Sequence, residues 1–264
     1  MKKIMTKGSY RPTISYGNRI KRSSVRKGTK TILALDPPYS RSKMIEEIIK
    51  IVREYESYIC AVKINFHMLL SYSPENIRTL NTFVHSYGIQ SIADIKLNDI
   101  MNSNSVILNR LHRLEFDCLI ANPIMGKDGL VALVELAHHL NMGVISLVYM
   151  STPYAIQTYG LNVLPRSNGR KYTPKCLYNV FLDYSIASKV DGIVVGATQI
   201  PILKIISRMT ELPIYSPGVG VQGGDMKKAI ASGTAYLIVG RSVFESKDPT
   251  KFLHRIKNIS NISS

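Results

Sequence analysis

The strongest constraint on the fold is a regular alternation that begins at residue 31 and continues to residue 257. Short apolar, β-branched runs of strand length alternate with stretches of helical length whose apolar residues recur every three to four positions. The expected strands cover 31–36, 58–65, 89–94, 117–122, 143–150, 191–196, 212–218 and 235–240. These runs are almost free of charge, which predicts strands covered on both faces, as in a parallel sheet.

A stretch of helical length follows each expected strand. These stretches cover 40–55, 73–88, 100–114, 127–140, 174–189, 199–209, 224–232 and 249–257. Eight such units favour a closed (β/α)8 TIM barrel over an open doubly wound sheet, and no GxGxxG pattern follows the first strand. With no linker or repeat inside it, we expect a single α/β catalytic domain over 31–258 and a C-terminal tail over 259–264.

The net charge of +16 is concentrated at the N-terminus. Residues 1–30 hold ten Lys or Arg, no Asp or Glu, and no apolar periodicity, which predicts a basic, disordered arm. Three interpretations stay open: a silent extension, a non-specific contact with RNA or another polyanion, and an organellar targeting segment. If the first holds, deleting residues 1–30 leaves turnover intact.

Several classes of protein do not fit the sequence. No apolar run approaches the ~18 residues of a membrane span. The three cysteines are widely spaced without a CxxC pattern, which favours a reducing cytoplasm over a disulfide framework. The six histidines lack metal-ligand spacing, so no metal site is expected. Ser151 has no neighbouring histidine to act as a base, which disfavours a hydrolase triad.

In a barrel of this kind, reactive groups lie at the C-terminal ends of the strands. Polar and charged residues follow the expected strands at those ends: Asp36, Lys63, Asp94, Lys96, Ser151, Gly240 and Arg241. The segment "SPGVGVQGGD" (216–225) adds four glycines directly before a helix. Converging backbone N–H groups, the helix N-terminus and a guanidinium suit an anion, so the last two loops are predicted to bind phosphate.

The segment "ADIKLNDI" (93–100) contains an acid, a base and a second acid. Together with Asp36 and Lys63 it would place two lysines and three aspartates at one rim, where alternating charges can all stay ionised. A fixed ammonium beside carboxylates can deliver a proton to a carbon that becomes negative. The alternative is an ion network that only stabilises the rim.

These residues resemble a known family. The set "LALD" (33–36), "VKIN" (62–65), "ADIKLNDI", "MSTP" (150–153), "SPGVGVQGGD" and "VGRS" (239–242) is similar to orotidine 5′-phosphate decarboxylases, with the archaeal-type branch as the nearest likeness. The resemblance implies a carboxy-lyase that converts orotidine 5′-phosphate to UMP and CO2 in de novo pyrimidine biosynthesis. It also implies a homodimer without metal or organic cofactor.

The resemblance also implies roles for single residues. Lys96 would protonate C6 of the pyrimidine, and Asp94 would face the substrate carboxylate and hold Lys96 in place. Asp36 and Lys63 would hold the ribose hydroxyls and complete the charge network. Asp99 and Ile100 would reach the neighbouring subunit's pocket. The residues implied to bind substrate are Asp36, Lys63, Asp94, Asp99, Ile100, Ser103, Ser151, Pro217, Gly218, Val219, Gly220, Gln222, Gly223, Gly240 and Arg241.

Some features depart from the family pattern. Met101 and Ser103 stand where the family often has Pro and Thr, and the segment 153–172 is longer than in compact archaeal members. Two alternatives remain at this stage. One is a metal-dependent sugar-phosphate lyase or aldolase of the same superfamily, of the hexulose-phosphate synthase or ketogulonate-phosphate decarboxylase type. The other is a basic RNA-binding protein on a barrel scaffold.

Overall fold

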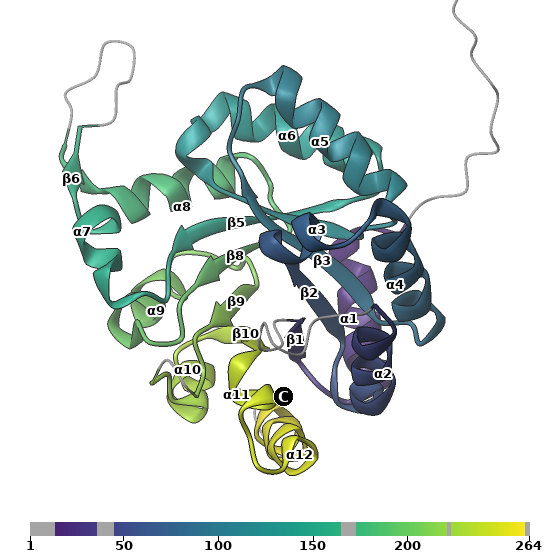
Figure 1. Ribbon diagram of the computed structural model, residues 1–264. Helices are drawn as coiled ribbons and strands as arrows, with labels where there is room; N and C mark the ends of the chain where they lie inside the picture. The colour runs from purple at the N-terminus through teal and green to yellow at the C-terminus, as the bar shows by residue number, and fades with distance from the viewer. Residues whose placement is uncertain (1–13, 36–44, 165–172, 221–222, 262–264) are drawn as a thin grey trace, which may run out of the picture.

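The chain forms a closed barrel of eight parallel strands (Figure 1). The computed structural model describes residues 14–35, 45–164, 173–220 and 223–261. Around the barrel the strand order is β1-β10-β9-β8-β5-β4-β3-β2. The bounds are β1 Thr31–Leu35, β2 Ala61–Asn65, β3 Gln90–Leu97, β4 Cys118–Ala121, β5 Gly143–Tyr149, β8 Gly192–Val195, β9 Ile214–Pro217 and β10 Thr234–Val239. The predicted (β/α)8 fold and its eight strands are confirmed.

Each barrel strand is followed by a helix on the outside of the barrel. These helices are α2 Ile45–Tyr55, α4 Pro74–Ser86, α5 Met101–Arg113, α6 Lys127–His139, α8 Leu177–Ala187, α9 Ile200–Ile206, α10 Met226–Ala231 and α12 Pro249–Asn261. All eight were predicted. Helix α12 continues to Asn261 and so takes in three residues of the expected C-terminal tail.

Shorter elements lie in the loops. They are helices α3 Phe66–Ser71, α7 Ile156–Tyr159 and α11 Arg241–Phe244, the 3₁₀ turns η2 Glu56–Tyr58, η3 Pro123–Met125 and η4 Pro153–Ala155, and the strands β6 Asn162–Val163 and β7 Lys175–Cys176, which form an antiparallel pair. The pair accounts for part of the long segment 153–172, and residues 165–172 lie outside the described residues.

Side chains of the strands alternate between two apolar layers. Ile145 and Leu147 of β5 belong to the cluster that fills the barrel interior, whereas Val144 and Val148 belong to the layer between strands and helices. This period of two is the geometry of a pleated strand, and it explains why both faces of every strand had to be apolar.

The expectation of an arm without structure over 1–30 is wrong for helix α1, Tyr16–Lys27. Tyr16 and Ile20 are almost fully buried and belong to the interior cluster. The helix crosses the N-terminal ends of the strands, behind β2 and β3 in Figure 1. Its buried positions, Tyr16, Ile20, Ser23 and Ser24, follow helical spacing, but two are serines, so no apolar stripe was visible. Residues 1–13 lie outside the described residues.

Polar contacts hold α1 in place. Arg19 donates to the side chain of Gln90 at 3.1 Å and to the backbone carbonyls of Asp117 and Asn141 at 3.3 and 3.0 Å. Ser23 donates to the carbonyl of Cys60 at 2.7 Å. Gln90 begins β3, and the other three partners lie just before β2, β4 and β5, so the helix links four strands. Within the described ranges, no helix combines the length and apolarity that a bilayer crossing needs.

Candidate active site

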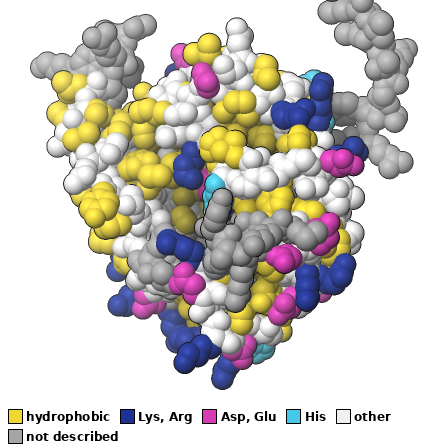
Figure 2. Space-filling view, in the orientation of Figure 1, with side chains coloured by type: hydrophobic (Ala, Val, Ile, Leu, Met, Phe, Trp, Pro, Cys, Tyr) yellow, Lys and Arg dark blue, Asp and Glu magenta, His cyan; other side chains and the backbone are white. Residues whose placement is uncertain are grey.

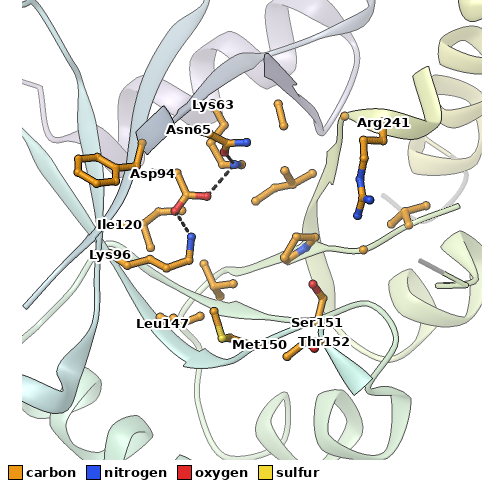
Figure 3. Close-up of a pocket in the computed structure, with 18 of the residues that line it drawn as sticks. Lys63, Asn65, Asp94, Lys96, Ile120, Leu147, Met150, Ser151, Thr152 and Arg241 are labelled. Atoms are coloured by element: carbon orange, nitrogen blue, oxygen red, sulfur yellow. Dashed lines mark hydrogen bonds and ion pairs between the residues drawn. The ribbon is translucent and has the colours of Figure 1, made fainter. Parts of the chain in front are cut away.

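A cavity of about 760 Å³ opens at the C-terminal ends of the strands (Figure 3), opposite α1. Its floor is made of apolar side chains that point into the barrel: Ala34, Ile120, Leu147, Val194 and Ile238. Polar groups come from the C-terminal ends of β2 and β3 and from the segments that follow β2, β5, β9 and β10. The barrel therefore offers an apolar base with polar walls, a combination typical of sites for small molecules.

Three predicted residues form a charge network on one wall. Asp94 accepts hydrogen bonds from two ammonium groups, Lys63 at 2.6 Å through Oδ2 and Lys96 at 2.7 Å through Oδ1. Lys63 also donates to the amide oxygen of Asn65 (Figure 3). Lys63 and Asp94 are buried, whereas the side chain of Lys96 is 40% exposed and faces the cavity. Both lysines line the cavity, and Lys96 is the more exposed of the two ammonium groups.

The electrostatics of the network keep Asp94 ionised. Burial of this carboxyl group acts to raise its pKa, but the positive charges of Lys63 and Lys96, together with their hydrogen bonds, outweigh burial and lower the pKa from its ordinary value. A carboxylate fixed between two ammonium groups holds both in a defined geometry. It also repels any second anion placed beside it.

The backbone of Lys96 is unusual. Its φ of 47° lies in the left-handed region, where a non-glycine residue costs roughly 1–3 kcal/mol. The pairing of β3 with β4 shifts register between Ala93 and Leu97, as in a β-bulge. Such bulges re-aim side chains, so the strain at Lys96 is the cost of turning its ammonium towards Asp94 and the cavity.

A second group of residues lines the cavity on the side of β9 and β10. Gly218 and Gly220 have φ of 94° and 81°, and a Cβ on Gly220 would lie 2.3 Å from the hydroxyl of Ser242. Ser242 donates to the carbonyl of Val219 at 2.7 Å, which joins the two loops. The exposed guanidinium of Arg241 lies beside them at the cavity (Figure 3). The predicted anion-binding residues Pro217, Gly218, Val219, Gly240 and Arg241 therefore gather at one end.

Ser151 lies on the wall opposite Lys63, with Met150 and Thr152 (Figure 3). Its carbonyl accepts a hydrogen bond from Thr198 at 2.9 Å. A Cβ on Gly196 would come within 2.5 Å of the Ser151 Cα, so glycine is required for this close approach. Residues after β5 and β8 thus fix the position of the serine.

Other predicted residues are not at this cavity. Asp99, Ile100 and Ser103 do not line it, and the Ile100 side chain is 70% exposed. Gly220 and Gly223 belong to the glycine-rich loop without lining the cavity. Asp36 and Gln222 lie outside the described residues.

The cavity-lining residues that sequence reasoning missed include Asn65, Phe66 and His67. They end β2 and begin α3, a helix that was not predicted. Asn65 is the last residue of β2, and a position at a strand end was the signal that identified the charged residues. Its side chain is an uncharged amide, which is common at protein surfaces and so gave no signal of its own. No three or more His, Cys, Asp or Glu side chains of the described ranges lie close enough together to hold a metal ion.

Comparison with known proteins places this geometry in a family. The model of the orotidine 5′-phosphate decarboxylase / HUMPS family matches residues 29–256. The chain belongs to this family. An orotidine 5′-phosphate decarboxylase from Thermoplasma volcanium is 34% identical over 218 residues, 83% of this chain and 87% of the relative. The enzyme of the same name from Pyrococcus abyssi is 30% identical over 213 residues, 80% and 91% of the two chains.

Solved structures agree with the family assignment. The orotidine 5′-monophosphate decarboxylase from Methanocaldococcus jannaschii, complexed with the inhibitor BMP, superposes with a TM-score of 0.73 at 28% identity. The match covers 88% of this chain and 99% of that one. The family contains both decarboxylases and HUMPS-type enzymes, so the residues of the site decide which reaction a member catalyses.

Proposed function

We propose that this protein is an orotidine 5′-phosphate decarboxylase, which converts orotidine 5′-phosphate to UMP and CO2. The observation that carries the proposal is Asp94 held between Lys63 and Lys96, with Lys96 facing the cavity. The names of the relatives that span most of the chain point the same way.

The chemistry follows from the positions of these charges. When the bond from C6 to the carboxylate breaks, its electron pair stays on C6 and CO2 departs. The Lys96 ammonium gives its proton to C6 and becomes an amine, which water then reprotonates. An ammonium already oriented by Asp94 stabilises the negative charge as it develops, without reorganisation at the moment of reaction.

The rest of the cavity suits a nucleotide. The glycines after β9 and the Arg241 guanidinium would bind the phosphate, and Ser151 would hydrogen-bond the pyrimidine. We assign Asp36 and Lys63 to the ribose hydroxyls, Gln222 and Gly223 to the phosphate side, and Ser103 to a polar contact. Binding energy from the phosphate, far from C6, can hold the reacting carbon in place.

We also propose a homodimer in which Asp99 and Ile100 reach the neighbour's cavity. Five exposed apolar side chains support this, and we name them the rim patch: Phe66, Leu70, Ile100, Val106 and Ile124. Hydrophobic groups reach the surface on the face seen in Figure 2. Where such groups lie together in one patch, they are typical of a protein interface. The three free cysteines support a cytoplasmic location.

The test is a direct assay. Purified protein with orotidine 5′-phosphate should produce UMP and lose the substrate's absorbance, with the same rate in excess EDTA. Lys96→Ala should lose turnover by more than ~1000-fold and still bind UMP, because the anion-binding residues are unchanged. A protein inactive on this substrate, or active only with added metal on a sugar phosphate, would refute the proposal in favour of a HUMPS-type reaction.

A further inference from the structure

Asn104 is a buried polar residue that the catalytic scheme does not use. It is the fourth residue of α5 and is 1% exposed. Its side chain turns back over the start of the helix to the segment Asp99–Ile100. Residue Ile100 occupies the N-cap position, and an apolar side chain cannot accept the hydrogen bonds that usually cap a helix.

The Asn104 amide bonds both backbone polar groups of Asp99. The N–H of Asp99 donates to Asn104 Oδ1 at 3.1 Å, and Asn104 Nδ2 donates to the carbonyl oxygen of Asp99 at 2.6 Å. The same Nδ2 lies 3.8 Å from the sulfur of Met125, in η3. One planar side chain therefore fixes the peptide groups on both sides of Asp99, and packing fixes that side chain in turn.

Asp99 and Ile100, the residues beside these hydrogen bonds, make few other contacts within the described part of their own chain that would order them. Asp99 is exposed, and its Oδ1 accepts a hydrogen bond from the N–H of Ile100 at 2.7 Å. Ile100 is 70% exposed. A segment that presents a carboxylate to another surface needs contacts within its own chain to keep it ordered. The two hydrogen bonds from Asn104 to the backbone of Asp99 are such contacts.

We propose that Asn104 is a positioning residue that acts through Asp99 and Ile100 on the active site of the neighbouring subunit. The inference rests on the proposed function and its dimer. A displacement of about 1 Å in a substrate-binding group can cost ~100-fold in rate, so Asn104→Ala should lower kcat/KM by ~10–100-fold. Because Asp99 as a whole is exposed, water can replace part of what its backbone loses, so we expect the substitution to disorder this segment more than it destabilises the fold.

The test uses hybrid dimers that carry two different affinity tags and are purified through both. In a dimer of Asn104→Ala with Lys96→Ala, one site combines the intact Lys96 of one protomer with the intact Asp99 segment of the other. This dimer should have about half the wild-type activity per dimer and the wild-type KM. In a dimer of wild type with the double variant Lys96→Ala/Asn104→Ala, the one site with Lys96 receives the defective segment and should show the reduced kcat/KM.

Two outcomes would overturn the proposal. Equal activity of the two hybrids would mean that Asn104 does not act across the interface. Restored activity in the second hybrid but not in the first would mean that Asn104 acts in its own subunit. A loss from misfolding is separable, because the first hybrid is active only if the Asn104→Ala protomer forms its own cavity. If Asn104→Ala does not fold, Asn104→Ser enters the same two hybrids.

Two further variants separate this inference from the proposed function. Asn81→Ala is the matched control, because Asn81 is equally buried and also donates to a backbone carbonyl, that of Leu114 at 2.7 Å, far from the cavity. It should lose stability and keep the wild-type KM. Asp99→Ala in place of Asn104→Ala tests the shared site itself. If activity is restored in the first type of hybrid with Asp99→Ala but not with Asn104→Ala, the shared active site stands and only the proposed role of Asn104 is rejected.

Discussion

At the scale of single residues, Asp94 controls how the positive charges of the site are arranged. Each of its two oxygens accepts a hydrogen bond from one ammonium group, so Lys63 and Lys96 are held apart and in different orientations. Without that carboxylate the two like charges would repel each other in a partly buried wall. The orientation of Lys96 at the cavity depends on this one group.

The substitution Asp94→Asn tests this dependence. An amide can accept from one ammonium, but its NH2 group faces the other, so Lys96 or Lys63 loses its partner. We expect kcat to fall by ~100–1000-fold, the range found when one preorganised electrostatic contact is removed. The affinity for UMP, measured by calorimetry, should change far less. A kcat within ~10-fold of wild type would argue against the role of Asp94 in orienting Lys96.

Sequence reasoning found the charged residues of the site, together with Ser151 and the loops after β9 and β10, and missed the amides Asn65 and Asn104. Lys63, Asp94 and Lys96 stand out because charge is rare at the end of an apolar strand. Asn65 accepts a hydrogen bond from Lys63 on the same strand, and Asn104 bonds the backbone of the loop after β3, contacts that are known only from the three-dimensional structure. No composition or spacing rule distinguishes such amides from surface ones.

At the scale of elements, helix α1 closes the end of the barrel opposite the cavity. Tyr16 enters the interior cluster, and burial together with the neighbouring Tyr215 raises the pKa of its phenol well above the ordinary value. The first residue of β5 is Gly143, and a Cβ there would lie 2.5 Å from the Tyr16 ring. The helix and the strand therefore fit together only with glycine at that position.

A double-mutant cycle measures this fit. Gly143→Ala should destabilise the protein by ~1–3 kcal/mol, the usual cost of overpacking. In a Tyr16→Ala background the same substitution should cost much less, because the ring that it would strike is gone. Urea unfolding of the four proteins gives the coupling. Additive effects would mean that Tyr16 does not dock on Gly143. For the same reason, deleting residues 1–30 is now expected to lower stability, contrary to the prediction for a dispensable arm.

Helix α4 is tied to β4 by a titratable contact. His85 bonds Asp117 at 2.8 Å, and this hydrogen bond raises the pKa of His85 above its ordinary value of 6.5 against the opposing effect of burial. A raised folded-state pKa stabilises the protein below the unfolded-state pKa, and this stabilisation is lost as the pH rises through the folded-state value.

The Tm difference between wild type and His85→Gln should therefore be larger at pH 6 than at pH 8.5. Thermal unfolding of both proteins at the two pH values checks this, with His138 present in each so that its own contact with Asp191 cancels. A constant difference would mean that the charge on His85 contributes nothing to folding.

The predicted elements differ in how clearly the sequence displayed them. The strands and outer helices carry an apolar face of fixed period, and all were found. Helix α1 buries two serines, and its exposed side is strongly basic, so charge concealed the pattern. Helix α3 has only six residues, fewer than two turns, which is too short for periodicity to be read.

At the scale of the whole molecule, the described surface is uneven. The rim patch has five exposed apolar side chains, on α3, at the N-cap of α5, within α5 and on η3, and one of them, Phe66, lines the cavity. Other exposed apolar residues, Tyr154, Ile156 and Leu161, lie on and beside α7. The barrel could be predicted from eight repeated units, but which surfaces meet another subunit depends on side-chain exposure, which no sequence period encodes.

The substitution Leu70→Glu tests the assembly. Leu70 is 73% exposed, so a charge there should leave the isolated fold intact and disfavour burial in an interface. We expect a shift from dimer to monomer in sedimentation velocity, with loss of turnover in proportion. Ile156→Glu, at 61% exposed, is the control and should remain dimeric. If Leu70→Glu sediments as wild type does, the rim patch is not the interface.

Docking of α1 has a consequence for synthesis on the ribosome. Arg19 binds Asp117 and Asn141, which follow it by 98 and 122 positions. Helix α1 is therefore synthesised long before the surface on which it packs. Tyr16 and Ile20 stay exposed to water until most of the first five strands have been made. Lys21, Arg22 and Arg26 are exposed on the same helix, and charged side chains of this kind favour solubility of the helix before it packs. The contacts that hold α1 can therefore be complete only after the chain has been made as far as Asn141.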